Sequence, residues 1–212
     1  MKAFGQNRED IYIYNTFFRN QSDGFYIDVG AHDGITISNS ILFERLGWDG
    51  ICIEAHPTYY KKLLTHRNCT CIFAAAGNED SEEVTFYLNQ GGGLSSLDKN
   101  MENVWREQHR PRFKGYNETA QVPMMTLNTI LKEYSAPKII DYVTIDVEGC
   151  EMLVLEGIDL TEYHVKVFIV EVIRGLKDKR DALDKYMINN NYKYVTTLGI
   201  ENHIYYKPIG SI

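Results

Sequence analysis

The chain contains 212 residues with a formal net charge of −7, and 44% of the residues are hydrophobic. This length and composition favour one globular domain over residues 1–212 with a sizeable core. The negative net charge argues against a protein that binds nucleic acid over its whole surface. No stretch of ~18 apolar residues is present, and residues 1–6 lack the apolar region of a signal peptide, so we expect a cytoplasmic protein without a membrane partner.

Helical and extended patterns alternate along the chain. Apolar periodicity and end signals predict helices over Glu9–Arg19, about Ile37–Leu46, Pro57 through Leu64, about Asn100–Gln108, Thr126 through Tyr134, Cys150–Glu156 and Asp178–Asn190. Apolar runs predict strands over Phe25–Gly30, Gly50–Glu54, Cys71–Ala75, Glu83–Leu88, Gln121–Met125, Ile139–Asp146, Val165–Glu171, Tyr192–Thr197 and His203–Tyr206.

Such alternation is typical of an α/β fold, a doubly wound and mostly parallel sheet with helices on both faces. The last two strands predict a terminal antiparallel pair, which such a sheet tolerates. Residues 1–23 form an N-terminal helical segment in this prediction. The polar, glycine-rich stretch 89–118 is too long for a passive connection, so we interpret it as an insertion and a candidate lid.

The segment around Gly30 and Gly34 carries the first functional signal. A strand ending at Asp28, a glycine loop and a helix form an arrangement in which backbone N–H groups approach a ligand closely. The next strand ends at Glu54, at the separation expected for a carboxylate that binds a ribose. Together these features favour an adenosine-containing cofactor across the carboxyl ends of two parallel strands.

Other strand ends also carry small or acidic residues. The third strand delivers Ala75 and Ala76, which leave room for a flat ring, while later strands deliver Asp146, Glu148 and Glu171. Because ligands of open α/β sheets bind beyond the carboxyl ends of the strands, we expect these residues to share one site.

Three stretches resemble the FkbM family of S-adenosylmethionine-dependent methyltransferases. They are Tyr-Ile-Asp-Val-Gly-Ala-His-Asp-Gly-Ile-Thr from Tyr26, Gly-Trp-Asp-Gly-Ile-Cys-Ile-Glu-Ala-His-Pro from Gly47, and Ile-Asp-Tyr-Val-Thr-Ile-Asp-Val-Glu-Gly-Cys-Glu from Ile140. The resemblance covers about residues 5–172. Many members have Pro where this chain has Ala55, and Lys where it has Thr144.

The resemblance implies a Rossmann-like class I methyltransferase with S-adenosyl-L-methionine as its cofactor, acting on an oxygen of a small molecule or glycan. The cofactor-binding residues that it implies are Asp28 at the methionine end, Gly30, Ala31 and His32 in the loop, Glu54 and Ala55 at the ribose, Ala75 and Ala76 beside the adenine, and Asp146. His32 could equally be a loop histidine that faces solvent.

The same resemblance puts Asp146 and Glu148 where the methyl acceptor should lie, so we assign them as catalytic, with a crowded carboxylate as base. We assign Glu171 and His109 to the substrate. Purely structural roles stay open as alternatives. Asp146 and Glu148 could cap a helix, and His109 could belong to a solvent-exposed loop. The three acids could hold Mg²⁺, but the family does not require a metal, and we predict none.

Two rival functions remain. An NAD-dependent oxidoreductase or epimerase also uses a strand, a loop and an acid on the second strand. Its loop normally has the motif Gly-x-Gly-x-x-Gly, and the segment Gly30–Gly34 lacks this spacing. A binding module could keep the methyltransferase fold without turnover. The sequence indicates neither the acceptor nor the oligomeric state.

Overall fold

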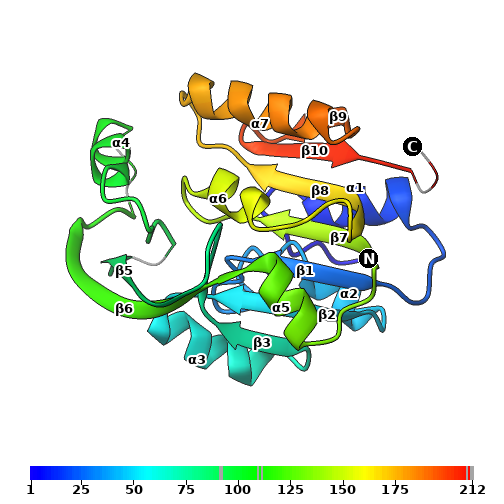
Figure 1. Cartoon of the computed structure of the whole chain (residues 1–212), viewed down its shortest axis with the longest axis horizontal. Coiled ribbons are helices and arrows are strands. Elements are labelled where there is room, and N and C mark those ends of the chain that lie inside the picture. The colour runs from blue at the N-terminus through cyan, green and yellow to red at the C-terminus, as the bar shows by residue number, and fades with distance from the viewer. Residues whose placement is uncertain (91–92, 109, 111, 209, 211–212) are drawn as a thin grey trace.

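A seven-stranded sheet forms the centre of the computed structural model, which describes residues 1–90, 93–108, 110, 112–208 and 210. Its strands lie in the order β3-β2-β1-β7-β8-β10-β9 (Figure 1). They are β1 (Phe25–Val29), β2 (Asp49–Glu54), β3 (Thr70–Phe73), β7 (Ile139–Ile145), β8 (His164–Glu171), β9 (Lys193–Leu198) and β10 (Asn202–Tyr206). β10 runs antiparallel to both β8 and β9, and the other strand pairs of this sheet are parallel, which confirms the α/β fold with a terminal antiparallel pair.

The strand order reverses between β1 and β7. The chain moves outward from β1 to β3 and then returns to β7 on the other side of β1, so β1 has β2 and β7 as parallel neighbours. A crevice at the carboxyl ends of the strands is expected at such a reversal. The register brings Asp28 of β1 opposite Thr144 of β7 and Cys52 of β2.

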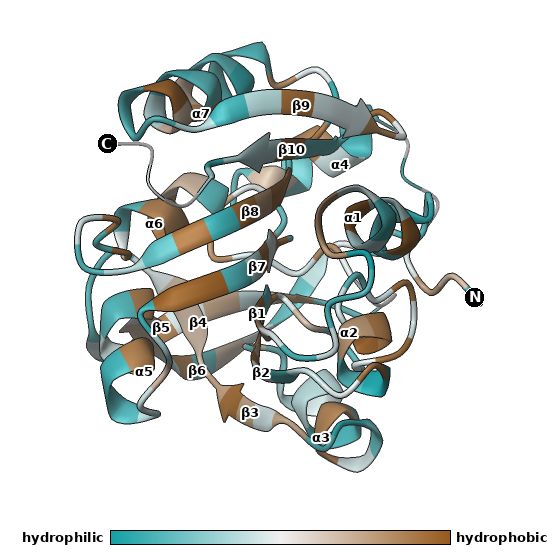
Figure 2. Ribbon diagram, turned by 90° about the vertical axis from the view of Figure 1, so that its right-hand side faces the viewer, coloured by the Kyte–Doolittle hydropathy of each residue, from teal (hydrophilic) through white to brown (hydrophobic). Residues whose placement is uncertain are grey.

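Helices cover both faces of this sheet, as Figure 2 shows from the side. They are α1 (Glu9–Phe17), α2 (Ile41–Arg45), α3 (Pro57–His66), α5 (Leu127–Glu133), α6 (Glu151–Glu156) and α7 (Lys177–Asn189). The first three contribute Ile13, Phe43 and Leu63 to one apolar cluster, and the last three contribute to the other, for example through Val154. Burial on both faces explains the apolar runs within β7 and β8, such as residues 167–170 in β8.

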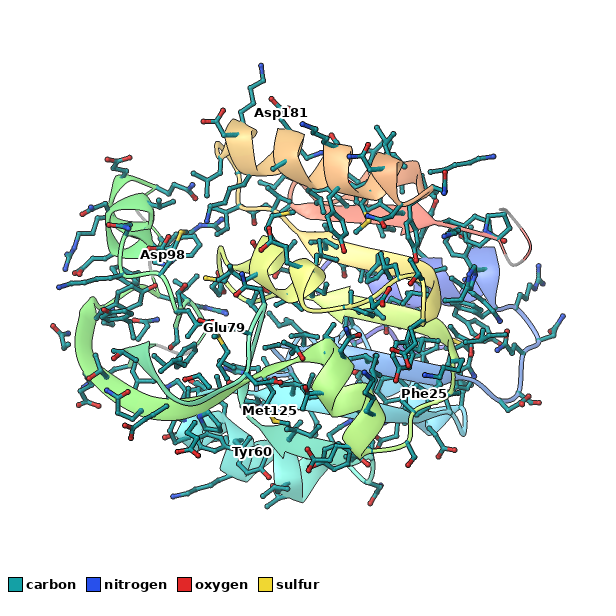
Figure 3. The ribbon with its side chains drawn as sticks, in the orientation of Figure 1. Phe25, Tyr60, Glu79, Asp98, Met125 and Asp181 are labelled. Atoms are coloured by element: carbon teal, nitrogen blue, oxygen red, sulfur yellow. The ribbon has the colours of Figure 1, made fainter. Side chains whose placement is uncertain are left out.

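A second, three-stranded sheet was not predicted. It has the order β4-β6-β5 and consists of β4 (Ala75–Gly77), β5 (Ser81–Asn89) and β6 (Tyr116–Thr126), with α4 (Met101–Glu107) in the excursion between β5 and β6. The prediction of one strand over Cys71–Ala75 is wrong, because the chain leaves the main sheet after Phe73 and β4 pairs with β6. Met125 of β6, labelled in Figure 3, packs against the large core and joins the two sheets.

The helix predicted over Ile37–Leu46 is shorter than expected. Ile37 has a φ of 51° and is exposed, and α2 begins only at Ile41. The hydroxyl of Ser38 accepts hydrogen bonds from the amides of Ser40 and Ile41, which holds the preceding residues in a turn. The other predicted helices and strands of the main sheet lie within two residues of their expected bounds. Within the described parts of the chain, no helix is long and apolar enough to cross a bilayer.

Candidate active site

A cavity of about 580 Å³ opens at the carboxyl ends of β1, β2, β7 and β8. The predicted site residues that line it are Asp28, Gly30, Ala31, His32, Glu54, Ala55, Ala75, Ala76, Asp146, Glu148 and Glu171. One sheet edge therefore gathers residues that lie up to 143 positions apart in the chain. His109 lies outside the described residues, so its assignment to the substrate stays a prediction.

The turn after β1 forms the floor of the cavity. Gly30 has a φ of 87°, and a Cβ added there would overlap the carbonyl oxygen of Asp146. The amides of Gly30 and Ala31 donate to the carbonyl of Ile53 at 3.0 and 3.1 Å. Only glycine suits this position, because the backbone is left-handed and the end of β7 is in contact with it.

Glu54 is held at the end of β2 by two backbone amides. Its Oε2 accepts a hydrogen bond from the amide of His32 at 2.7 Å, and its Oε1 accepts one from the amide of His56 at 2.6 Å. Burial raises the pKa of this carboxyl to about 7, although the two amides act in the opposite direction. Each oxygen keeps a further lone pair, so the carboxylate can still accept hydrogen bonds from a vicinal diol.

Asp28 lies on the other side of the turn, and it is also buried. The hydroxyl of Ser40 donates to its Oδ2 at 2.5 Å, and a guanidinium nitrogen of Arg67 lies 4.0 Å from the same oxygen. Burial raises the pKa of Asp28 to about 6, and both Arg67 and Ser40 lower it. This carboxyl group is suited to a ligand that carries a positive charge.

Apolar residues of the second sheet, together with one residue that follows β2, form another wall. Ala55, Ala75 and Phe86 belong to one buried cluster and line the cavity. On the rim, the rings of His32 and Tyr59 stack with their centroids 3.8 Å apart. This wall consists mainly of apolar and aromatic groups, which suit the binding of an aromatic ring.

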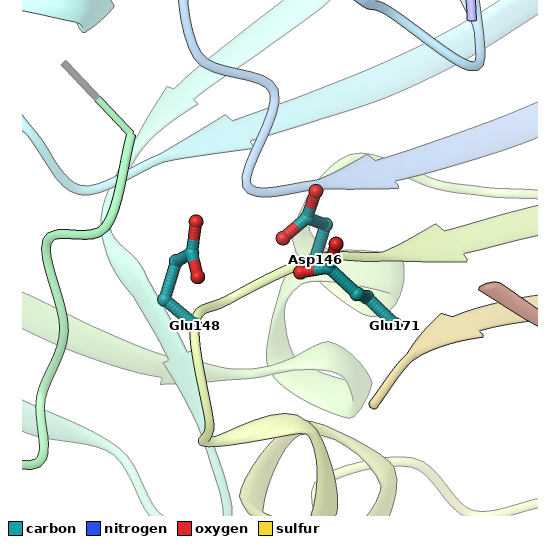
Figure 4. Close-up of side chains that lie close together, drawn as sticks. All are labelled: Asp146, Glu148 and Glu171. Atoms are coloured by element: carbon teal, nitrogen blue, oxygen red, sulfur yellow. The ribbon is translucent and has the colours of Figure 1, made fainter. Parts of the chain in front are cut away.

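Three carboxyl groups gather where β7 and β8 end (Figure 4). Oxygens of Asp146, Glu148 and Glu171 all lie within 4.8 Å of one another, a spacing at which they could hold a metal ion. Burial raises the pKa of Glu171 well above its ordinary value, and a hydrogen bond with Asp146 raises it further. The same hydrogen bond lowers the pKa of Asp146, which burial raises. Burial and neighbouring acids raise the pKa of both carboxyls, so this pair retains a proton more readily than two separate surface carboxyls would.

Glu148 already has hydrogen-bond partners in the segment between β5 and β6. Its Oε1 accepts a hydrogen bond from the amide of Leu94 at 3.0 Å, and its carbonyl accepts one from the hydroxyl of Ser96 at 2.9 Å. By contrast, Asp146 Oδ1 is buried and has no hydrogen-bond partner among the described residues. Of the two residues assigned as catalytic, Asp146 is therefore the better placed to accept a proton.

An ion pair that the sequence did not predict lies on the rim beside Glu171. Arg110, from the excursion, pairs with Glu201, which precedes β10, and both line the cavity. Glu201 also accepts a hydrogen bond from the amide of Arg174 at 3.0 Å. Arg110 lies in the stretch 89–118 that the sequence marked as an insertion, but nothing around Glu201 distinguished it from a surface acid. The lid assigned to residues 89–118 stays a prediction, although Leu94, Ser95, Arg110 and Arg112 line the cavity.

The sequence matches the family model described as the methyltransferase FkbM domain over residues 28–194. The chain belongs to this family of methyltransferases, as its resemblance predicted. No curated protein matches the sequence.

Several solved structures align with the chain at low sequence identity and with TM-scores below 0.5. The METTL16 methyltransferase domain is 11% identical with a TM-score of 0.46, and the alignment covers 93% of this chain and 65% of that one. A putative class I S-adenosylmethionine-dependent methyltransferase from Listeria monocytogenes is 9% identical with a TM-score of 0.47, covering 99% and 62%. The human methyltransferase 10 domain containing protein is 10% identical with a TM-score of 0.45, covering 92% and 78%. The chain spans less than two thirds of the length of the first two.

Proposed function

We propose that this methyltransferase uses S-adenosylmethionine and transfers the methyl group to an oxygen of a small molecule or sugar. The observation that carries the proposal is the pair of buried carboxyls, Asp28 and Glu54, which flank the left-handed turn at Gly30 in the cavity. S-adenosylmethionine supplies a methyl group on a cationic sulfur, and its ammonium and its ribose hydroxyls are groups that these carboxyls suit.

The donor and acceptor groups of the cavity fit this cofactor. Glu54 would accept hydrogen bonds from the two ribose hydroxyls, because two amides fix its orientation. Asp28 would face the ammonium of the methionine end, and the wall of Ala55, Ala75 and Phe86 would take the adenine. Binding at both groups would set the position of the reacting carbon, and holding the reactants in the required geometry lowers the barrier to the transfer.

The acceptor would lie beside Asp146 and Glu171. Asp146 Oδ1 would accept the proton of the acceptor hydroxyl, while S-adenosylmethionine would supply the methyl group and leave as S-adenosylhomocysteine. That oxygen has no hydrogen-bond partner among the described residues, so it is available for this role.

Oxygen is favoured as the acceptor atom because this end of the cavity presents several hydrogen-bond acceptors. Asp146, Glu171 and Glu201 offer carboxyl oxygens, which bind hydroxyl groups of a polyol or sugar. A cavity of about 580 Å³ suits a small molecule. A small-molecule or glycan acceptor as the partner, the absence of nucleic acid and a cytoplasmic location all stay predictions.

Calorimetric titration with S-adenosylmethionine, S-adenosylhomocysteine and NAD tests the proposal. We expect the first two to bind and NAD not to bind, with Glu54→Ala weakening both. Binding of NAD instead would favour the oxidoreductase or epimerase. Binding of the sulfur compounds with no product from a panel of hydroxylated acceptors would favour a non-catalytic module.

A further inference from the structure

Arg67 is a buried arginine below the cofactor end of the cavity. It follows α3, and only 5% of its surface is exposed. A guanidinium in such a position must be both paired and hydrogen-bonded. Its partners therefore show what the fold uses the charge for.

One side of the guanidinium faces the helical layer. Nε donates to Glu44 Oε2 of α2 at 2.7 Å, and Nη2 donates to the hydroxyl of Tyr26 at 2.8 Å. Glu44 in turn accepts hydrogen bonds from that hydroxyl and from the amide of Asn68. These contacts join α2, β1 and the end of α3.

The other side faces the turn that follows β1. Nη1 donates to the carbonyl of Gly34 at 3.2 Å and to the hydroxyl of Ser40 at 3.1 Å. Ser40 then donates to Asp28 Oδ2 at 2.5 Å. Arg67 therefore reaches Asp28 twice, through Ser40 and by its own charge at 4.0 Å. Both contacts engage Oδ2, and Asp28 lines the cavity.

The charges around Asp28 make this contact important. Titratable groups that interact with Asp28 electrostatically are Cys52 and Glu54 of β2, Arg67 and Cys69 before β3, Tyr142 of β7 and Asp146 after β7. Arg67 is the only cation in this set. Without it, burial and the neighbouring acids would favour a protonated Asp28.

We propose that Arg67 is a positioning residue for the cofactor: with Ser40 it holds Oδ2 of Asp28, directs the other carboxyl oxygen into the cavity and keeps the group negatively charged for the ammonium of the methionine end. The inference rests on the proposed function, because it assigns the methionine end of S-adenosylmethionine to Asp28. The same arrangement fixes the loop through Gly34, whose absent side chain leaves room for the stem of Arg67.

A merely structural role predicts a different outcome. If Arg67 only joins α2 to α3 through Glu44, its loss weakens the whole site, and every ligand that contains adenosine loses affinity. If Arg67 acts through Asp28, only ligands with an amino-acid end lose affinity. Two ligands separate these cases: S-adenosylhomocysteine has the amino-acid end, and 5′-methylthioadenosine lacks it.

The experiment is calorimetric titration of the full chain with both ligands between pH 5 and pH 8.5. The variants are Arg67→Met and Ser40→Ala, and Glu44→Gln is the matched control because it alters only the helical side of Arg67. Ser40→Ala keeps the buried charge, so it tests the contact even where Arg67→Met fails to fold.

We expect Arg67→Met and Ser40→Ala to lower the affinity for S-adenosylhomocysteine at least tenfold at pH 7 and to change that for methylthioadenosine less than twofold. The affinity for S-adenosylhomocysteine divided by that for methylthioadenosine gives a ratio in which any effect of a variant on ribose binding cancels. In the wild type this ratio should rise with pH around the pKa of Asp28, about 6, and in the variants its midpoint should move up by about one pH unit.

Equal losses for both ligands, or an unchanged midpoint in Ser40→Ala, would overturn the positioning role. So would an effect of Glu44→Gln as large as that of Ser40→Ala. If the wild type binds neither ligand, it is the proposed function that fails, and the two failures are thereby distinguished.

Discussion

Substitution of Glu54 by Gln is the sharpest test of the ribose contact. Gln keeps the size of the side chain but replaces one acceptor oxygen by an NH₂ group, so one ribose hydroxyl loses its charged acceptor. A hydrogen bond to a charged group contributes about 2 kcal/mol net, which corresponds to a loss of roughly 30-fold in affinity for S-adenosylhomocysteine.

The pH dependence of ligand affinity provides a second, independent estimate of the contribution of Glu54. With a pKa of about 7, Glu54 is roughly one tenth ionised at pH 6, so ligand affinity of the wild type should rise about tenfold from pH 6 to pH 8 through this group alone. In Glu54→Gln this rise should disappear. The remaining pH dependence should be centred near 6, where Asp28 titrates.

The assay is isothermal titration calorimetry at half-unit steps between pH 5.5 and pH 8.5, with the unfolding temperature checked at each pH. Glu133→Gln serves as the control, because Glu133 is an exposed carboxylate of α5. A variant that binds as tightly as the wild type, or that keeps a rise centred near pH 7, would refute the assignment of Glu54 to the ribose.

Three further predictions concern stability and turnover. Gly30→Ala should lower the free energy of unfolding by roughly 2–4 kcal/mol in urea titrations, because the new Cβ strains the left-handed backbone and also overlaps the carbonyl of Asp146. Gly175→Ala, at a similar φ of 88° with open space around it, should lower that free energy by only about 1 kcal/mol. Equal losses in the two variants would show that the overlap with Asp146 contributes nothing. Asp146→Asn should reduce kcat at least ~100-fold while S-adenosylhomocysteine still binds, and full turnover would remove Asp146 as the base. The ligand-free protein should lose stability as the pH rises from 5 to 8, because Asp28 and Glu54 have raised pKa values near 6 and 7 in the folded state. The stability that a raised pKa contributes is fully present at a pH below the pKa of the unfolded state. It is lost as the pH rises through the pKa of the folded state. For Glu54 this amounts to about 3 kcal/mol, and an unfolding temperature that rises over this range would contradict it.

The sequence by itself predicted the elements of the main sheet, because their signals are local. The apolar runs that become β7 and β8 show burial on both faces, and Pro57 begins a helix where its missing N–H costs nothing. Thr126 caps α5 through a hydrogen bond from the amide of Thr129. Parallel strands then determine that Asp28, Glu54 and Asp146 meet at one edge.

Only the tertiary structure decided the second sheet and the surroundings of these acids. Ala75 and Ala76 look like the end of a main-sheet strand, but they pair instead with Met124 and Met125, about 50 positions away in the chain. Nothing local distinguishes Arg67 from a surface arginine, or Glu201 from a surface glutamate. Their roles arise from contacts between segments far apart in sequence, and a pattern of neighbouring residues carries no information about such contacts.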